Sequence, residues 1–77
     1  MMLNKILELD KKGYSIEIHN TDFETLEVAI EKNGWGVCEL VNFEGLRTLE
    51  EKKIRMQLVL NKMEAELERI LVVQNAN

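Results

Sequence analysis

The last third of the chain carries the feature that most restricts its fold. From Leu49 to about Val73 apolar residues recur with a helical period, over roughly 25 residues or about 37 Å at 1.5 Å per residue. Thr48 and Glu51 fit a capping box, in which the two residues satisfy each other's backbone N–H at the start of a helix. The pattern predicts a helix over about 48–73, which is long for a chain of 77 residues.

This predicted helix is apolar on two opposite sides. One stripe follows alternating spacings of three and four residues, and a second lies about 155° away when each residue is advanced by 100°. The first stripe consists of Leu46, Leu49, Met56, Leu60, Met63, Leu67 and Ile70, with Lys53 as the exception, and the second of Ile54, Leu58, Ala65 and Val72. Because a helix that lies on one sheet buries one stripe only, the other stripe needs a second cover.

Two covers for the second stripe remain open. Either the N-terminal helix and the sheet wrap both stripes within one monomer, or the helix pairs with another copy of the chain. We expect a homodimer or higher oligomer, because the distal half of the helix, from about Leu58 to Val73, outruns strands of some 17–20 Å. The residues predicted to mediate self-association are Ile54, Leu58, Ala65, Val72, Met56, Leu60, Met63, Leu67 and Ile70.

The rest of the chain predicts one short helix and three strands. Leu3, Ile6 and Leu7 form the apolar side of the helix, and Gly13 is a natural left-handed stop. Alternating apolar residues after it indicate a three-stranded antiparallel meander. We therefore expect a single α+β domain over 1–77, in the order αβββα. The predicted ranges are a helix over about 2–12, strands over about 14–19, 25–32 and 35–41, a turn at 20–22 and the helix over 48–73.

The hairpin around Asn33-Gly34 allows two registers. A two-residue loop pairs Ile30 with Val37 but places Glu39 opposite Val28 on the core face. A three-residue loop over 32–34 pairs Val28 with Cys38 instead and keeps the core face free of charge, so we expect this second register.

In the preferred register an apolar stripe framed by acidic residues lies on the outer face of the sheet. Such a surface suits docking of a basic protein surface, with an aromatic anchor at its centre. The predicted partner-binding residues are Trp35, Val37, Val41, Glu27 and Glu39.

The composition excludes several classes of protein. A hydrophobic fraction of 45% is too high for a disordered segment, and a single cysteine excludes a disulfide framework and a cysteine-based zinc site. A net charge of −4 argues against nucleic-acid binding. The N-terminal segment is too acidic for a signal peptide, and no run approaches the roughly 20 apolar residues of a membrane span, so we expect a cytoplasmic protein without a membrane role.

The residues that carry chemistry are few. His19 is the sole histidine and is read as a solvated strand-end residue, while Cys38 lacks a basic partner and is read as a small core residue. No carboxylate pair, phosphate loop or metal-binding signature has the spacing that catalysis requires. We therefore expect no enzymatic activity, no metal and no cofactor.

The first 35 residues or so resemble the small type II-A anti-CRISPR proteins of phages and prophages. The matching run is a short helix over Leu3–Leu9, Lys11-Lys12-Gly13, the alternating strand that follows Tyr14, and Thr21-Asp22 before a hairpin with an Asn-Gly turn. The resemblance implies a helix, a three-stranded sheet and further helices, and an acidic surface that mimics DNA to block a Cas9 nuclease. The C-terminal half departs from that family, because the two-striped helix stands where the family is acidic.

Together these observations predict a non-enzymatic protein-interaction module, a phage or prophage accessory protein that self-associates through its last helix and binds or inhibits a host protein. A purely structural homo-oligomer is the alternative, and a regulator associated with nucleic acid is a weaker one.

Overall fold

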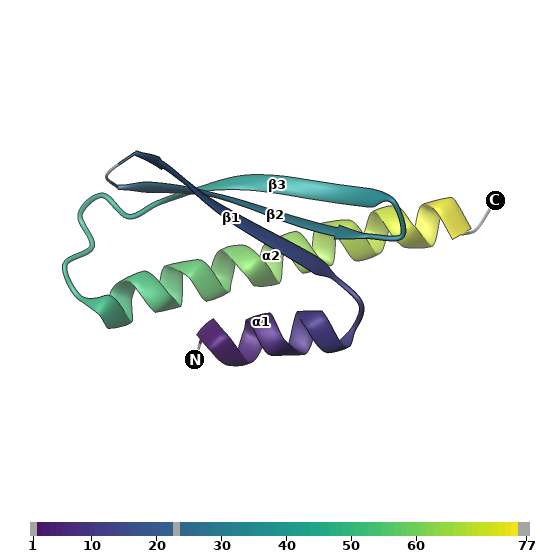
Figure 1. Cartoon of the computed structure of the whole chain (residues 1–77), viewed down its shortest axis with the longest axis horizontal. Helices are drawn as coiled ribbons and strands as arrows, with labels where there is room; N and C mark the ends of the chain where they lie inside the picture. Colours follow the sequence, from purple (N-terminus) through teal and green to yellow (C-terminus); the bar gives the residue numbers. More distant parts are fainter. Residues whose placement is uncertain (1, 23, 76–77) are drawn as a thin grey trace.

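The computed structural model describes residues 2–22 and 24–75, with side chains for 4–22 and 24–74. The elements are α1 (Met2–Lys11), β1 (Ser15–Asp22), β2 (Thr25–Lys32), β3 (Trp35–Asn42) and α2 (Leu49–Asn75) (Figure 1). This order confirms the predicted αβββα fold, and the bounds differ from the predicted ones by no more than three residues.

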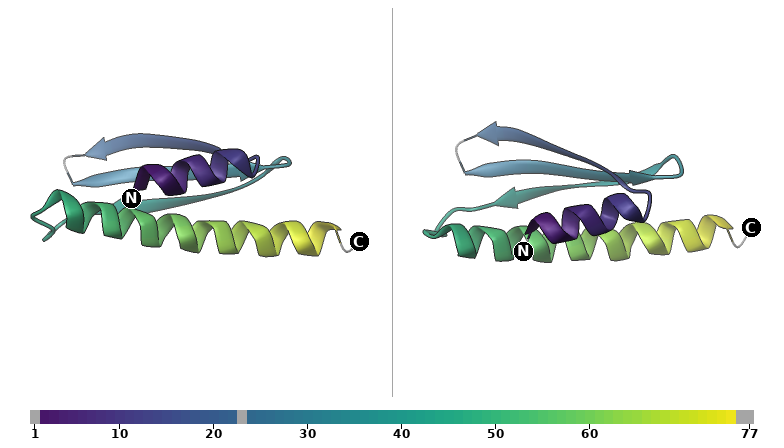
Figure 2. Two further views of the ribbon diagram at one scale, coloured as in Figure 1. Left: turned by 90° about the horizontal axis from the view of Figure 1, so that it is seen from below. Right: turned by 60° about the horizontal axis from the view of Figure 1, so that its bottom comes forward.

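The molecule has two layers. The strands form an antiparallel sheet in the order β1-β2-β3, and both helices lie on one face of it (Figure 2). We call the face that the helices cover the inner face and the other the outer face. Since α2 has 27 residues and spans about 40 Å, it sets the longest dimension of the molecule, 45 Å.

A single apolar core lies between the layers. The sheet contributes Val28, Ile30 and Val41 from its inner face, and α1 contributes Leu9. The remaining members are Tyr14 and four residues of α2, namely Met56, Leu60, Met63 and Leu67.

The end of α1 places two of these residues. Gly13 has a φ of 91°, and the N–H of Tyr14 donates to the carbonyl of Leu9 over 3.0 Å, while that of Gly13 donates to Asp10 over the same distance. This left-handed helix stop brings Tyr14 against Leu9 and turns the chain directly into β1.

The hairpin between β2 and β3 has the other register, so the predicted three-residue loop is wrong. Asn33 and Gly34 both have positive φ, 56° and 82°, as a two-residue type I′ turn requires. Lys32 therefore pairs with Trp35, Ile30 with Val37, Val28 with Glu39 and Leu26 with Val41. The turn conformation thus outweighs the electrostatic preference that favoured the longer loop.

The charge of Glu39 on the inner face is accommodated because β3 is an edge strand. Its side chain is only half-buried, and the Nζ of Lys62 on α2 donates to its Oε1 over 3.1 Å. That hydrogen bond raises the pKa of Lys62. A carboxylate next to solvent with a lysine in reach does not force a register shift.

The first strand is longer than predicted. β1 continues to Asp22, so residues 20–22, predicted as a turn, belong to the strand and contain an irregularity of its pairing with β2. The turn follows instead, where the Oδ1 of Asp22 accepts the N–H of Glu24 over 2.9 Å and the hydroxyl of Thr21 donates to the carbonyl of Thr25 over 3.1 Å.

The predicted capping box begins α2. The hydroxyl oxygen of Thr48 accepts the N–H of Glu51 over 3.1 Å, and the N–H of Thr48 donates to the Oε1 of Glu51 over 3.3 Å. The start of the long helix is therefore fixed by a local sequence signal.

Candidate functional site

The two stripes of α2 have different environments. Met56, Leu60, Met63 and Leu67 face the sheet and are at most 2% exposed. On the opposite side Ile54, Leu58 and Val72 are 60%, 61% and 67% exposed, and Ala65 between them is also exposed. We call these last four residues the outer line. The sheet and α1 cover only one stripe, so the alternative in which one monomer wraps both is wrong.

The predicted self-association residues therefore divide into two groups. The outer line is accessible, but Met56, Leu60, Met63 and Leu67 form the monomer core and Ile70 packs partly against it. The reason is that the strands have eight residues each, about 26 Å rather than the expected length of roughly 17–20 Å, so the sheet covers more of α2. The core residues are not available to a partner.

Charged side chains of both signs follow the outer line on the side of α2 that faces β3. Arg55 donates to the carbonyl of Asn42 over 2.9 Å, and Lys62 binds Glu39. Along the helix the flanking charges are, in order, Glu51, Arg55, Lys62, Glu66 and Arg69.

A second apolar surface lies at the other side of α2, near its first turns. It is a groove of about 360 Å³ between α2 and the inner face of the sheet, lined almost entirely by apolar atoms. Its apolar residues are Ile18, Leu26, Phe43, Leu49 and Met56. Lys52 and Lys53 also line it, and Ile18 and Leu49 are 43% and 66% exposed.

This groove exists because α1 is short. With 10 residues α1 is about 15 Å long, little more than half the length of β1. Figure 2 shows that α1 lies against the part of the sheet where β1 begins. The helix does not reach the part where β1 ends. Sequence reasoning missed the groove, although the unequal lengths of helix and strand were its signal.

An ion cluster joins the two helices. The carboxylate of Glu64 on α2, 11% exposed, binds the ammonium groups of Lys5 and Lys12, the latter over 2.9 Å, and Lys5 also binds Glu8 over 2.9 Å. Burial disfavours the charged carboxylate, but the hydrogen bonds from Lys5 and Lys12 outweigh it and lower the pKa of Glu64. This cluster fixes α1 against α2 and was also missed from the sequence, since Glu64 lies more than 50 residues from Lys5 and Lys12.

The structure does not assemble the predicted partner-binding surface as one patch. Val41 is buried and Val37 packs against the core, because the observed register turns both to the inner face. Trp35 is 44% exposed at the hairpin end, and Glu39 is held by Lys62. Glu27 lies on the outer face, so the five residues are divided between the two faces of the sheet.

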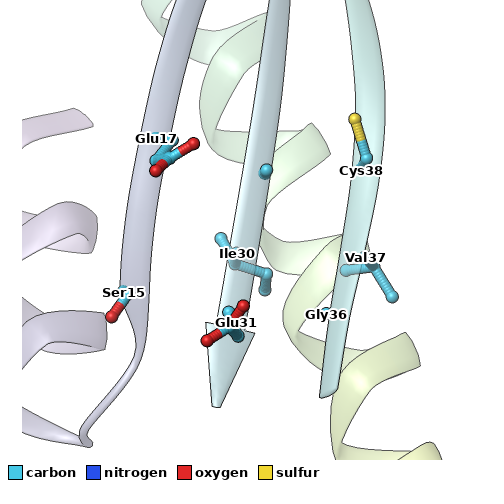
Figure 3. Close-up of a pocket in the computed structure, with 8 residues that line it drawn as sticks. Ser15, Glu17, Ile30, Glu31, Gly36, Val37 and Cys38 are labelled. Carbon is cyan, nitrogen blue, oxygen red and sulfur yellow. The ribbon is translucent and has the colours of Figure 1, made fainter. Parts of the chain in front are cut away.

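The outer face carries a shallow hollow instead, of about 440 Å³ (Figure 3). The small residues Ala29 and Gly36 form its floor, and Glu17, Glu31 and Cys38 come from the three strands around it. Cys38 is exposed rather than buried in the core as predicted. Desolvation at the sheet surface and the carboxylate of Glu27 raise the pKa of its thiol, which disfavours the nucleophilic thiolate.

The other titratable groups show no convergent arrangement within the described part of the chain. The ring of His19 is exposed, with its Nε2 3.3 Å from the carboxylate of Glu17. Among the described residues no three His, Cys, Asp or Glu side chains are grouped so as to hold a metal ion. Nor does any helix within residues 2–22 and 24–75 have the length and apolar character to cross a membrane.

Comparison with models of protein families, with curated proteins and with solved structures found no match for this chain. The resemblance to anti-CRISPR proteins therefore stays a prediction from the sequence.

Proposed function

We propose that this chain is a non-catalytic protein-interaction module that works as a homodimer joined along α2. The observation that carries the proposal is the outer line, four apolar residues at helical spacing on the side of α2 away from the core. In a monomer this line lies in water over much of the length of the helix. Pairing with an identical line removes it from water without disturbing the core.

The charges beside the outer line favour an antiparallel, two-fold pair. With the two helices antiparallel and centred near residue 61, Glu51 of one copy faces Arg69 of the other, and Arg55 faces Glu66. Two-fold symmetry repeats both pairs, which gives four contacts between opposite charges. The same arrangement places Leu58 beside the small Ala65 of the second copy, so that the two helices can approach closely.

The size of the contact is sufficient for a weak to moderate dimer. A standard specific interface buries about 800 Å² per partner, roughly one seventh of the 5437 Å² that this chain exposes. A helix of 27 residues paired along its length is of that order.

The test is to charge the outer line. Leu58→Glu combined with Val72→Glu places acidic groups in the proposed contact, and we expect the mass in light scattering after gel filtration to fall from about twice 9.0 kDa to the monomer value. Leu49→Glu is the matched control, an equally exposed leucine of the same helix that lies outside the line, and it should leave the dimer intact.

A wild-type chain that runs as a monomer at high micromolar concentration would contradict the proposal. The orientation is tested separately by reversing charges. Arg55→Glu and Glu66→Arg should each weaken the dimer, and the double variant should restore it if the helices are antiparallel.

We also propose that the dimer binds a second protein, as expected for a phage or prophage accessory protein of the kind that the first 35 residues resemble. The phage or prophage origin is tested by identifying the genes that neighbour this one. If the dimer binds no second protein, the function reduces to self-assembly, the structural alternative named above.

A further inference from the structure

The groove beside α1 is a part of the inner face, next to α2, that neither helix covers. Ile18 of β1 and Leu26 of β2 share this face with core residues, yet α1 reaches only the opposite end of the sheet. Leu49 and Met56 on α2 and Phe43 in the loop before it form the other wall. The surface is built like the core but lacks one covering element.

The shape of the missing element follows from the layers. A one-sided sheet buries its apolar face against helices, and here α1 and α2 supply that layer except beside the end of β1. The uncovered space continues the layer of α1 along the side of α2. An amphipathic helix laid there would place residues at i, i+3, i+4 and i+7 against Ile18, Leu26 and Leu49.

The charge of the groove indicates which charged side chains the incoming helix should carry. Its two charged lining residues are Lys52 and Lys53, in a chain whose net charge is −4. Lys53 has a long contact to Glu50, 3.7 Å, and Lys52 has no ion pair among the described residues. The ammonium group of Lys52 is therefore available to a carboxylate of an incoming helix, and within the described chain that of Lys53 shares only the exposed carboxylate of Glu50.

We propose that this groove binds an amphipathic helix of a partner protein, with its apolar side on the sheet and acidic residues beside Lys52 and Lys53. The inference extends the proposed function by naming the chemistry of the second partner. It does not depend on the dimer, because the groove and the outer line lie on opposite sides of α2. The groove therefore stays open when two copies pair.

The test uses a synthetic helical peptide of about 15 residues with leucines at i, i+3, i+4 and i+7 and glutamates elsewhere, together with the same peptide carrying lysines in place of the glutamates. Each is titrated into the isotope-labelled full-length chain and followed by amide NMR shifts. We expect the glutamate peptide to shift residues of the groove, including Ile18, Leu26 and Leu49, and to bind several-fold more tightly than the lysine peptide.

Variants separate this site from the dimer contact. Leu49→Glu should weaken the glutamate peptide at least about tenfold, because it removes an apolar anchor and adds a like charge. It should not unfold the chain, since the leucine is exposed and a glutamate suits the first turn of a helix. Leu58→Glu should leave peptide binding unchanged, and Lys52→Glu with Lys53→Glu should reverse the preference between the two peptides.

Three results with the peptides would overturn the inference. They are no binding of either peptide at millimolar concentration, shifts that fall outside the groove, and equal affinity for both peptides that Leu49→Glu does not change. Decanoate serves as a probe for a small anionic amphiphile, and groove shifts with decanoate but not with the glutamate peptide would also reject a helical partner.

Discussion

Glu64 is the residue that joins the N-terminal helix to the rest of the molecule. Lys5 and Lys12 of the first segment both bind its carboxylate, from positions more than 50 residues away. The lowered pKa of Glu64 means that the folded state favours the charged carboxylate. The ion cluster therefore contributes stability that depends on pH.

Replacing this carboxylate should loosen α1. We expect Glu64→Gln to lower the free energy of unfolding by about 1–3 kcal/mol at pH 7, because the buried ammonium group of Lys5 and the half-exposed one of Lys12 both lose their charged partner. Urea unfolding followed by circular dichroism measures the change. Glu31→Gln, an exposed carboxylate of β2 outside both the cluster and the proposed dimer contact, is the control and should change stability little.

The pH dependence follows from the direction of the shift. A lowered folded pKa gives stability that is fully present above the ordinary carboxyl pKa of about 4.3 and is lost as the pH falls through the folded value. The difference between the native chain and Glu64→Gln should therefore shrink below about pH 4. A difference that persists unchanged in acid would show that the carboxylate charge is not its source.

At the scale of elements, the position of α2 depends on where the helix begins as well as on its apolar stripes. Thr48 and Glu51 satisfy each other's backbone N–H groups, so the helix begins at this point, beside the groove, and not earlier in the loop that follows β3. This start positions Leu49 and Lys52 at the wall of the groove.

Removing the cap should weaken the whole domain. Thr48→Ala leaves the N–H of Glu51 without its acceptor, and we expect a loss of about 1 kcal/mol in the free energy of unfolding. Thr48→Asp, which keeps an acceptor at the cap, should lose much less. Thermal unfolding of the three chains decides between this capping role and a general sensitivity of the loop.

For the whole molecule, the proposed dimer joined along α2 would make stability depend on concentration. Association that occurs only in the folded state raises the melting temperature by mass action, here by roughly 3–5 °C for each tenfold rise in protein concentration. Leu58→Glu with Val72→Glu should melt at one temperature at every concentration. A native chain whose melting temperature is also constant would argue against the dimer.

The distribution of apolar surface over the whole molecule supports two contacts rather than one. The outer line and the groove lie on opposite sides of the same helix, so the proposed second copy and the proposed helical partner would bind without overlap. A dimer that keeps its two grooves open would present them to two copies of a partner.

Much of the fold could be predicted because its signals are local. The left-handed stop at Gly13, the turn residues Asn33-Gly34 and the capping box at Thr48 each act within a few residues of the chain. Together with the apolar periods they placed every helix and strand to within three residues. The two stripes of α2 were also visible, because helical geometry alone places Leu58 opposite Leu60 and its neighbours in the core.

What the sequence by itself determined is therefore the order of elements and the amphipathic character of each. The sequence left two hairpin registers open, and the tertiary structure shows that the two-residue turn at Asn33-Gly34 is compatible with Glu39 on the inner face, because Lys62 of a distant helix reaches it. The tertiary structure also decided which stripe is buried, that Glu64 binds Lys5 of α1 and Lys12 just after it, and that α1 leaves a groove at the end of β1. These features depend on contacts between residues far apart in the chain, and local conformational preferences carry no information about such contacts.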